Sequence, residues 1–473
     1  MRITSIGHAG LFIESAAGSI VCDPWFTPAY FGSWVPFPDN TGVDPARLAA
    51  ADYLYISHLH HDHYDPQWLS RYMRKDITVL LPEFPVPDLH HALAGLGFKN
   101  FVQTRHNQPL VLDSGLRVQS SSVDAPLDGP LGDSGIALDD GRVRLFNQND
   151  SRPIELRPIQ EFGPLHAHLV QYSGAIWFPG AYTFPERVKR TLGTRKRRNG
   201  MARALRYIEQ LGAEHVLPFA GPACFLDDEL WHLNDFDGDP ANPFPDQFAF
   251  LEFLQEQGFD RAHLFLTGTE VDLHPDGTAR VAQIPDEEVA RIRDDRRGYL
   301  AEYQRKVQPA IDAITRALPQ DRSDLVAQLK EYVEPLMKEA DHTCAASTAG
   351  FCWRWRPSTA ARTRTSSSTS WTGGWTGTRA RRRATSSGSA ARWWRSWCGG
   401  AARTGWTSCS CPAAWRSPVR VRTTTTCTRS SNPSPRSTWR SWRTTTRRPT
   451  GTSTTRSRTD TWYRGAARTS RPI

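Results

Sequence analysis

Short apolar stretches alternate with polar residues along roughly the first 270 positions, a period-two spacing typical of half-buried β-strands. Turn residues separate these stretches, and the pattern predicts strands at residues 3–6, 11–14, 19–22, 51–56, 77–81, 100–103, 110–112, 116–120, 134–138, 142–147, 168–172, 175–178, 215–219 and 263–267. Helical spacing predicts helices at residues 67–74, 88–96, 201–212 and 247–257. The strand-rich pattern occurs in two halves, which predicts an α/β fold of two sheets packed face to face with helices outside.

The pattern changes after residue 285, where charged residues dominate and helical spacing continues between prolines. Helices are expected over residues 286–315 and 323–339, interrupted by Pro309, Pro319 and Pro335. The chain is therefore predicted to divide into a domain at 1–285, a helical extension or linker at 286–341, and a tail at 342–473.

The tail has a composition unlike that of the preceding residues. Residues 1–341 contain 33 Lys and Arg against 48 Asp and Glu, a net charge of −15. Residues 342–473 contain 25 Arg, no Lys and one acidic residue, Asp460, a net charge of +24. The tail also lacks Leu and Met, yet it holds 12 of the 17 Trp and six of the eight Cys. Neither an ordinary globular segment nor an ordinary disordered one has this balance.

A shifted reading frame near codon 342 explains this composition. If each tail codon is read from the last base of its predecessor, Trp codons become Leu, Met or Val codons, and Thr codons become Tyr, His, Asn or Asp codons. The missing aliphatic and acidic residues then reappear, so we interpret the encoded tail as out of frame and disordered. The alternative is a genuine Arg-rich tail that binds nucleic acid by counterion release. The absence of Lys and acids argues against it, and no nucleic-acid partner is expected.

Cysteine usage and hydropathy indicate the compartment. Outside the tail the chain has two cysteines, Cys22 and Cys224, which indicates a reducing environment rather than a disulfide framework. No run of about 18 apolar residues is present, so neither a membrane span nor a membrane partner is expected. These features predict a soluble cytoplasmic protein.

Four side chains that commonly bind metals follow the predicted strand at 51–56. His58, His60, Asp62 and His63 form the pattern H-x-H-x-D-H within six residues. Imidazole nitrogens combined with a carboxylate favour zinc, iron or manganese, and so dense a polar cluster is costly to bury without a metal. A solvated histidine-rich loop is the alternative, but it does not require an aspartate at this spacing. The loop therefore predicts a site for one or two divalent metal ions at the sheet edge.

The H-x-H-x-D-H motif, with Gly7-His8-Ala9-Gly10 and Asp23-Pro24 upstream, resembles the metallo-β-lactamase superfamily. The similarity is greatest to its ascorbate-phosphate-lactonase-like and CMP-N-acetylneuraminate hydroxylase-like branch, and it extends over about residues 1–270. The resemblance implies a four-layer αββα sandwich. It also implies one metal on the first two histidines of the motif and a second on its aspartate and last histidine. Asp62 is then the catalytic residue that orients or deprotonates the attacking water.

Further positions complete or modify this predicted site. By the resemblance, Asp150 bridges the metals from a strand end, although a turn-capping role is the alternative. Asp65 and His8 are expected to support the ligands from a second layer, His8 alternatively being an ordinary turn residue. The superfamily's third histidine is absent after the strand at 116–120, where Asp124 and Asp128 are the nearest candidates, and its last histidine is absent after 215–219. More carboxylates and fewer imidazoles favour iron or manganese over zinc.

A run of basic residues is the candidate for binding substrate. Arg195, Lys196, Arg197 and Arg198 follow one another, and their charge suits the phosphate of a small anionic substrate such as a nucleotide. A solvated loop is the alternative.

The last seven residues, read in the shifted frame, permit the string C-P-H-Q-x-A-D, which resembles the first cluster-binding box of Rieske [2Fe–2S] domains. Some members of the hydroxylase-like branch join the metal domain to a Rieske domain. We therefore expect a metal-dependent enzyme whose intact parent is a monooxygenase acting on a sugar-nucleotide-like anion, with an electron-transfer partner. The encoded chain itself is not expected to hold the cluster. The alternatives are a hydrolase of a phosphorylated or lactone-type substrate and a non-catalytic, metal-stabilised binding scaffold.

Overall fold

The computed structural model describes residues 1–123, 132–174, 178–180, 182–222, 224–236, 238–318 and 324–339. Asp124, Asp128 and the tail at 342–473 lie outside these residues, so what the sequence predicts for them stays a prediction. The same holds for most of the strand expected at 175–178.

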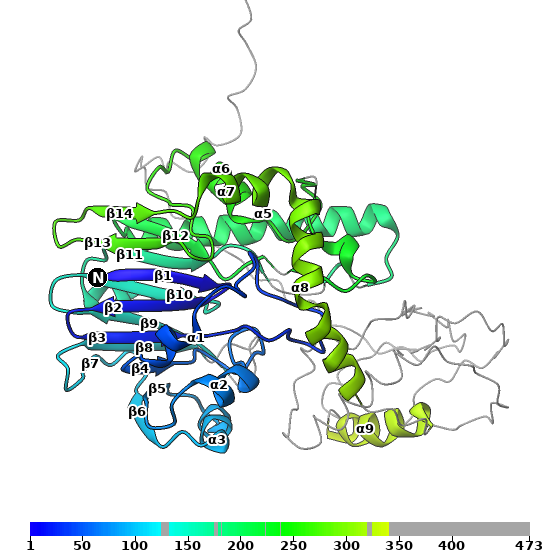
Figure 1. Cartoon of the computed structure of the whole chain (residues 1–473), viewed down its shortest axis with the longest axis horizontal. Coiled ribbons are helices and arrows are strands. Elements are labelled where there is room, and N and C mark those ends of the chain that lie inside the picture. Colours follow the sequence, from blue (N-terminus) through cyan, green and yellow to red (C-terminus); the bar gives the residue numbers. More distant parts are fainter. Residues whose placement is uncertain are drawn as a thin grey trace, which may run out of the picture. The chain divides into compact units, whose positions relative to one another are not determined.

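Two β-sheets form the centre of the fold (Figure 1). In the described part of the chain, the first sheet has eight strands in the order β14-β13-β1-β2-β3-β4-β5-β6. Their bounds are β1 Arg2–Gly7, β2 Gly10–Ser15, β3 Gly18–Cys22, β4 Tyr53–Tyr55, β5 Thr78–Pro82, β6 Asn100–Thr104, β13 Glu270–Leu273 and β14 Ala279–Ala282. Strands β3 to β6 run parallel to one another, so their carboxyl ends meet at one edge of the sheet.

The second sheet, within the same described ranges, has six strands in the order β12-β11-β10-β9-β8-β7. Their bounds are β7 Leu110–Val111, β8 Arg117–Val123, β9 Asp133–Asp139, β10 Arg144–Asn149, β11 Ala167–Gln171 and β12 His215–Phe219. Strands β10, β11 and β12 are parallel, whereas β8 and β9 pair antiparallel. The parallel strands again deliver their carboxyl ends to one edge.

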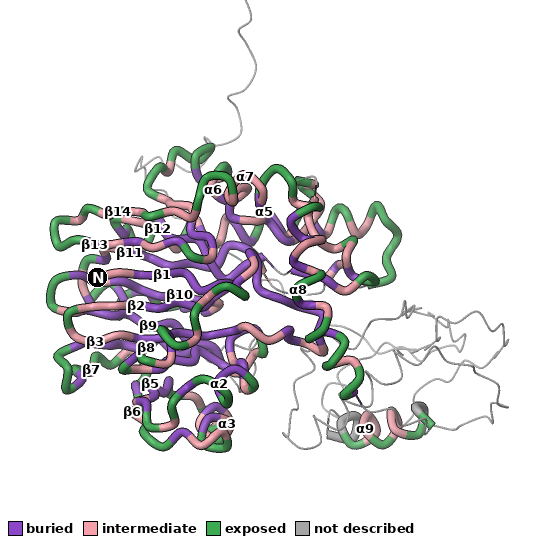
Figure 2. The backbone as a smooth tube through the Cα atoms, in the orientation of Figure 1, coloured by how far each residue is buried: buried purple, intermediate pink, exposed green. Residues whose placement is uncertain are grey.

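Apolar side chains between the two sheets form the main core. Ile13, Ile20 and Leu80 of the first sheet belong to one buried cluster with Val118 and Leu145 of the second. The alternation seen in the sequence puts these residues on the inner faces, because successive strand side chains point to opposite sides. Figure 2 shows this buried layer running through both sheets.

Helices cover the outer faces of both sheets. On the first sheet these are α1 (Pro45–Ala49), α2 (Pro66–Tyr72) and α3 (Asp88–Gly95). On the second sheet these are α4 (Arg157–Phe162), α5 (Glu186–Leu211) and α6 (Gln247–Glu256). The predicted α/β fold with four αββα layers is confirmed.

Two elements differ from the sequence prediction. Residues 263–267 are not a strand, because the side chain of Gln247 bonds both the N–H and the C=O of Phe265, each at 2.7 Å. The last two strands are instead β13 and β14, which form a hairpin. The sequence prediction missed them because charged residues interrupt the alternation of apolar and polar positions there. Helix α5 begins at Glu186 rather than at 201 and is 26 residues long. The sequence prediction missed its first half because this half is polar and shows little apolar periodicity.

The helices expected after residue 285 are α7 (Asp286–Asp294), α8 (Arg296–Ala317) and α9 (Leu325–Glu339), and a short 3-10 helix lies earlier at Trp231–Leu233. Ile292 of α7 and Tyr303 of α8 belong to one buried cluster with Phe37 and Cys224. Helices α7 and α8 therefore complete the core of the preceding domain instead of forming a separate linker. Within the described residues, no helix combines the length and apolar character needed to cross a bilayer.

Candidate metal centre

The candidate ligands lie where strands of both sheets end. His8 follows β1, Asp23 follows β3, Asn149 ends β10, and Ala220 follows β12. All four have a left-handed backbone, with φ between 42° and 60°, which costs a non-glycine residue about 1 kcal/mol or more. Tertiary bonds hold these turns: Ala220 N–H donates to the carbonyl of His8 at 3.0 Å, so the two sheets are joined at this edge. Such sharp turns direct the following side chains across the edge.

The first group of possible ligands consists of His8, Asp62 and His63, all buried. His8 Nε2 lies 3.3 Å from Asp62 Oδ2, and His63 Nε2 lies 3.7 Å from the same oxygen. Tyr30 donates its hydroxyl proton to the other oxygen, Asp62 Oδ1, at 2.7 Å. Asp62 is therefore oriented on one side and presents Oδ2 to the two imidazoles.

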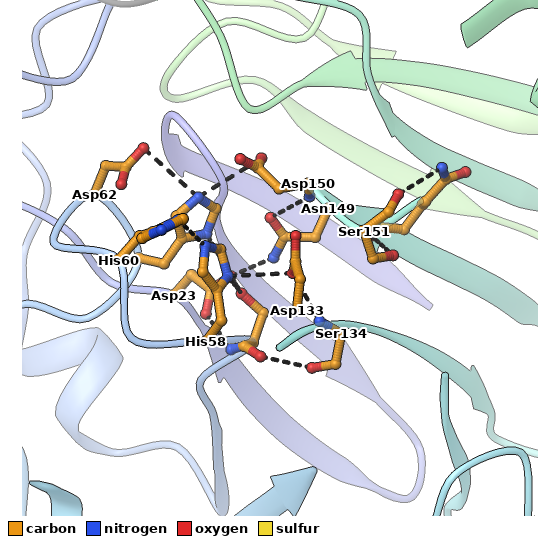
Figure 3. A network of polar contacts seen from close by, with 12 residues as sticks. Asp23, His58, His60, Asp62, Asp133, Ser134, Asn149, Asp150 and Ser151 are labelled. Carbon is orange, nitrogen blue, oxygen red and sulfur yellow. Dashed lines mark hydrogen bonds and ion pairs between the residues drawn. The ribbon is translucent and has the colours of Figure 1, made fainter. Parts of the chain in front are cut away.

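The second group consists of His58, His63 and Asp150, so His63 belongs to both groups. His63 Nε2 lies 3.6 Å from Asp150 Oδ1. His58 Nε2 lies 2.8 Å from Nδ1 of His60, which brings the fourth predicted motif residue to the same place. Figure 3 shows His58 and His60 gathered at this edge with Asp62 and Asp150.

Several buried polar atoms here suit a metal ion. His8 Nδ1 and Nε2, His63 Nε2 and Asp150 Oδ1 have no hydrogen-bond partner among the described residues, although buried polar atoms usually have one. Nitrogens bound to one ion at about 2.1 Å lie about 3.0–3.4 Å apart, close to the spacing of the His58 and His60 nitrogens. The donor set therefore fits a divalent metal.

The protonation states reflect the same crowding. Burial lowers the pKa of His58 well below its usual value, and the neighbouring His63 and His60 add to this. Burial also acts to lower the pKa of His63, but the carboxylates of Asp150 and Asp62 outweigh it and raise that pKa well above the usual value. For Asp62 burial acts upward, but His63 and His8 outweigh it and hold the pKa well below its usual range. Metal binding must therefore displace a proton from His63, which makes it pH-dependent.

Two carboxylates that sequence reasoning missed support the imidazoles. The fully buried Asp23 accepts hydrogen bonds from Ser57 N–H and Ser57 Oγ, both at 2.7 Å, and from the Asn149 amide. Its Oδ2 also lies 3.1 Å from His63 Nδ1, which leaves Nε2 facing the ligand site. Asp133 Oδ1 lies 3.2 Å from Nδ1 of His58 in the same way. The sequence did contain a signal for Asp23, because this residue directly follows a predicted strand. It contained no such signal for Asp133.

Other predicted site residues have different surroundings. Asp65 caps α2 by accepting from Trp68 N–H at 2.9 Å, and it also accepts from the N–H groups of Phe26 and Thr27. Its carboxylate thus holds the start of the helix and the adjacent loop. The expected contact with a ligand histidine is replaced by these backbone bonds. His61 is exposed, with its ring beside Tyr30, which agrees with its exclusion from the predicted ligands.

The predicted basic cluster does not form one surface. Successive helix residues point about 100° apart, and all four positions lie on α5. Arg195 and Arg198 are exposed, whereas Arg197 is buried in an ion pair with Asp235 at 3.2 Å. Lys196 is half-buried and donates to the carbonyl of Phe178 at 3.2 Å. Lys196 therefore differs from the other three basic residues in its surroundings, although all four lie on the same helix.

An αββα sandwich with imidazoles and carboxylates gathered at one strand-end edge defines a class of metal-dependent enzymes. Residues 2–127 match the family model described as a beta-lactamase superfamily domain. A curated relative from Mycolicibacterium smegmatis, named putative Rieske 2Fe-2S iron-sulfur protein, is 44% identical over 349 residues, which cover 73% of this chain and 67% of the relative. The chain belongs to the metallo-β-lactamase superfamily.

Solved structures of low similarity were also found. The isothiocyanate hydrolase from Delia radicum gut bacteria is 15% identical, with a TM-score of 0.43, over 58% of this chain and 100% of that chain. CmlA, a diiron β-hydroxylase from Streptomyces venezuelae, is 18% identical, with a TM-score of 0.38, over 60% of this chain and 54% of that chain.

Proposed function

We propose that this chain carries the metal-binding half of an oxygenase, whose intact relatives supply electrons from a Rieske [2Fe–2S] cluster. The observation that carries the proposal is the ligand set, in which Asp62 and Asp150 face His58 and His63 in a buried site. Carboxylates in this proportion suit iron or manganese better than zinc. The name of the 44%-identical relative supports the link to a Rieske cluster.

The chain's own residues position the ligands and hold the proton that a metal replaces. Asp23 fixes the orientation of His63 through Nδ1, and Tyr30 fixes Asp62 through Oδ1. The Oδ2 atom of Asp62 is the predicted proton acceptor, because it has no hydroxyl donor and faces imidazoles instead. Iron bound here would supply redox chemistry toward dioxygen, which these side chains cannot perform alone.

The tail, as encoded, lacks the ligands of a Rieske centre. Such a centre requires two cysteines and two histidines, but residues 342–473 contain a single histidine, His342. We therefore expect this tail to supply no electrons to the metal centre. We expect no electron transfer from NADH or NADPH by the encoded chain alone. Sequencing the gene across codon 342 tests the shifted reading frame. An uninterrupted frame at that codon would contradict the frameshift.

A metal-dependent hydrolase of a phosphorylated or lactone-type substrate is the second candidate. It is favoured by the two ligand groups that share His63, because paired ions can hold an attacking water and the oxygen that develops charge. Both candidates act on small anionic substrates.

Metal analysis of the purified full-length chain separates the two. Bound iron with no turnover of phosphate esters or lactones supports the oxygenase proposal. Bound zinc with such turnover supports the hydrolase. His61→Ala is the matched control, since His61 is an exposed neighbour of the ligands and should leave metal content unchanged. A protein that binds no metal after incubation with iron, zinc and manganese would contradict both candidates and favour a non-catalytic scaffold.

A further inference from the structure

Three cationic residues lie on the second sheet's side of the metal centre, in the segment after β10 and on the helix α5 that packs against this segment. Arg152 follows Asp150 by two residues, and Lys196 and Arg203 come from α5. Lys196 and Arg203 are seven residues apart, which is two helical turns, so they lie on the same face of the helix. Gly200 and Tyr207 share that face.

This face of α5 lies against the segments that follow β10 and β11. The hydroxyl of Tyr207 donates to the carbonyl of Pro153 at 3.1 Å. A Cβ atom added at Gly200 would lie 3.0 Å from the carbonyl oxygen of Tyr172, so the absence of a side chain lets the helix approach closely. A Cβ added at Gly174 would lie 3.7 Å from Cε of Lys196. The helix therefore brings Lys196 and Arg203 to the strand end that carries Asp150 and Arg152.

Two other basic residues on α5 are neutralised by ion pairs, but Arg152 and Arg203 are not. Arg190 pairs with Asp239 at 2.6 Å, and Arg197 pairs with Asp235 at 3.2 Å. For Arg152 and Arg203, the described residues provide no hydrogen bond or ion pair to a carboxylate. Moreover, Nε of Arg152 is buried and has no hydrogen-bond partner there. Buried guanidinium donors without an acceptor cost free energy unless a ligand supplies one.

The electrostatics of the cluster agree with this geometry. Burial lowers the pKa of Lys196 to about 7, with further lowering by the charges of Arg152 and Arg203. Burial also lowers the pKa of Arg203 to about 10, with Arg152 adding to the effect, while the charge of Asp150 acts in the opposite direction. An anion among the three cations would relieve both the burial cost and their mutual repulsion.

We propose that Arg152, Lys196 and Arg203 bind the phosphate or carboxylate group of the substrate and so place its reacting part at the metal centre. The positioning role rests on the proposed function of that centre, whereas anion binding does not. Guanidinium groups can hold either oxyanion through two parallel hydrogen bonds. Of the basic run predicted from the sequence, only Lys196 belongs to this site.

Calorimetric titration of the full-length chain with inorganic phosphate and with acetate, at constant ionic strength set by chloride, tests the proposal. We expect the wild-type chain to bind at least one of the two anions, and the better-bound anion identifies the oxyanion class. Arg203→Gln and Arg152→Gln should each weaken that binding at least tenfold. Arg203→Lys, which keeps the charge, should retain more of it than Arg203→Gln. The exposed Arg187→Gln on the same helix should stay within twofold of wild type.

Metal content and thermal unfolding are measured in parallel on each variant. Unchanged metal content with lost anion binding supports the anion site, whatever chemistry the metal performs. Because the cations repel one another, Arg203→Gln should unfold at no lower temperature than wild type in chloride, but phosphate or acetate should no longer stabilise it. The proposal is overturned if the wild-type chain binds neither anion at millimolar concentration, or if Arg187→Gln loses as much binding as Arg203→Gln. It is also overturned if folded Arg203→Gln and Arg152→Gln bind as the wild type does.

Discussion

The two sheets contribute to the metal centre in different ways. The first sheet supplies the imidazoles, most of them from the short loop between β4 and α2. The second sheet supplies carboxylates and an amide, Asp133, Asn149 and Asp150, from the start of β9 and the end of β10. At the end of β12, where the superfamily resemblance places a histidine, stands Ala220. The first sheet thus supplies most of the possible ligands, whereas the second sheet supplies one, Asp150, together with Asp133 beside His58.

Two of the imidazoles also face a carboxylate of the opposite sheet. His58 faces Asp133 at 3.2 Å and His63 faces Asp150 at 3.6 Å. Asp133 belongs to neither ligand group, and such an outer partner sets the ring orientation and the basicity of a ligand and typically changes metal affinity about 10- to 100-fold. We therefore expect losses in the first sheet to abolish binding and losses in the second sheet to weaken it.

The largest effect is expected from His63→Ala, because His63 belongs to both ligand groups. Sharing the binding energy of a typical four-ligand site gives each ligand about 2.5–4 kcal/mol, or roughly 100- to 1,000-fold in affinity. Asp150→Asn should lose less than His63→Ala, because Asp150 belongs to only one of the two groups. Competition with a chelator of known affinity measures both. Equal losses in the two variants would remove the distinction between the sheets.

Asp23→Ala should destabilise the metal-free chain by about 3 kcal/mol, because it leaves buried donors from Ser57 and Asn149 without an acceptor. Asp133→Ala, the matched change in the second sheet, should cost less, since Asp133 is nearer to solvent. Urea unfolding of the metal-free variants measures both values. If Asp133→Ala lost more unfolding free energy than Asp23→Ala, Asp23 would not be the main stabilising carboxylate at this edge.

The second sheet does contain an imidazole, His168 of β11, but it lies in the interior, with Nε2 2.8 Å from Oε1 of Gln148. Burial lowers its pKa to about 3. Below about pH 6.5 the unfolded chain binds a proton that the folded chain does not, so stability is complete above that pH and falls as the pH decreases toward 3. Between pH 7 and pH 5 the loss should be about 2 kcal/mol. In His168→Gln, the free energy of unfolding measured with urea should fall less between pH 7 and pH 5 than in the wild type. If it falls by the same amount, groups other than His168 cause the pH dependence.

The smallest effect on metal affinity is expected from Asp65→Ala. Because the buried Asp65 caps α2 and also accepts from the N–H groups of Phe26 and Thr27, its loss should cost about 2–3 kcal/mol of stability and leave metal affinity within twofold of wild type. Asp44→Ala is the control, since Asp44 caps α1 by accepting from Ala46 N–H at 2.9 Å. A tenfold loss of metal affinity in Asp65→Ala alone would return Asp65 to the site.

The sequence predicted the sandwich because apolar alternation survives in most core strands, such as β3 and β5. It predicted the imidazoles because His58, His60 and His63 lie in one short loop. It could not predict Asp133, whose role depends on the pairing of β8 with β9 and the docking of one sheet on the other. It also could not distinguish Lys196 from its basic neighbours, because their different directions follow from the helical period of α5, whose polar first half was not predicted to be helical.

The bond between Asp23 and Asn149 joins residues 126 positions apart, so it can form only after both sheets have docked. The ligand geometry is thus completed late in folding, and an unfolded chain keeps only the local histidine motif, without Asp150 or His8 beside it. An ion that binds the native state more tightly than the unfolded chain stabilises the native state increasingly as its free concentration rises. In a cell short of metal, the amount of surviving protein would then decline along with its activity, so that metal supply would regulate abundance through turnover.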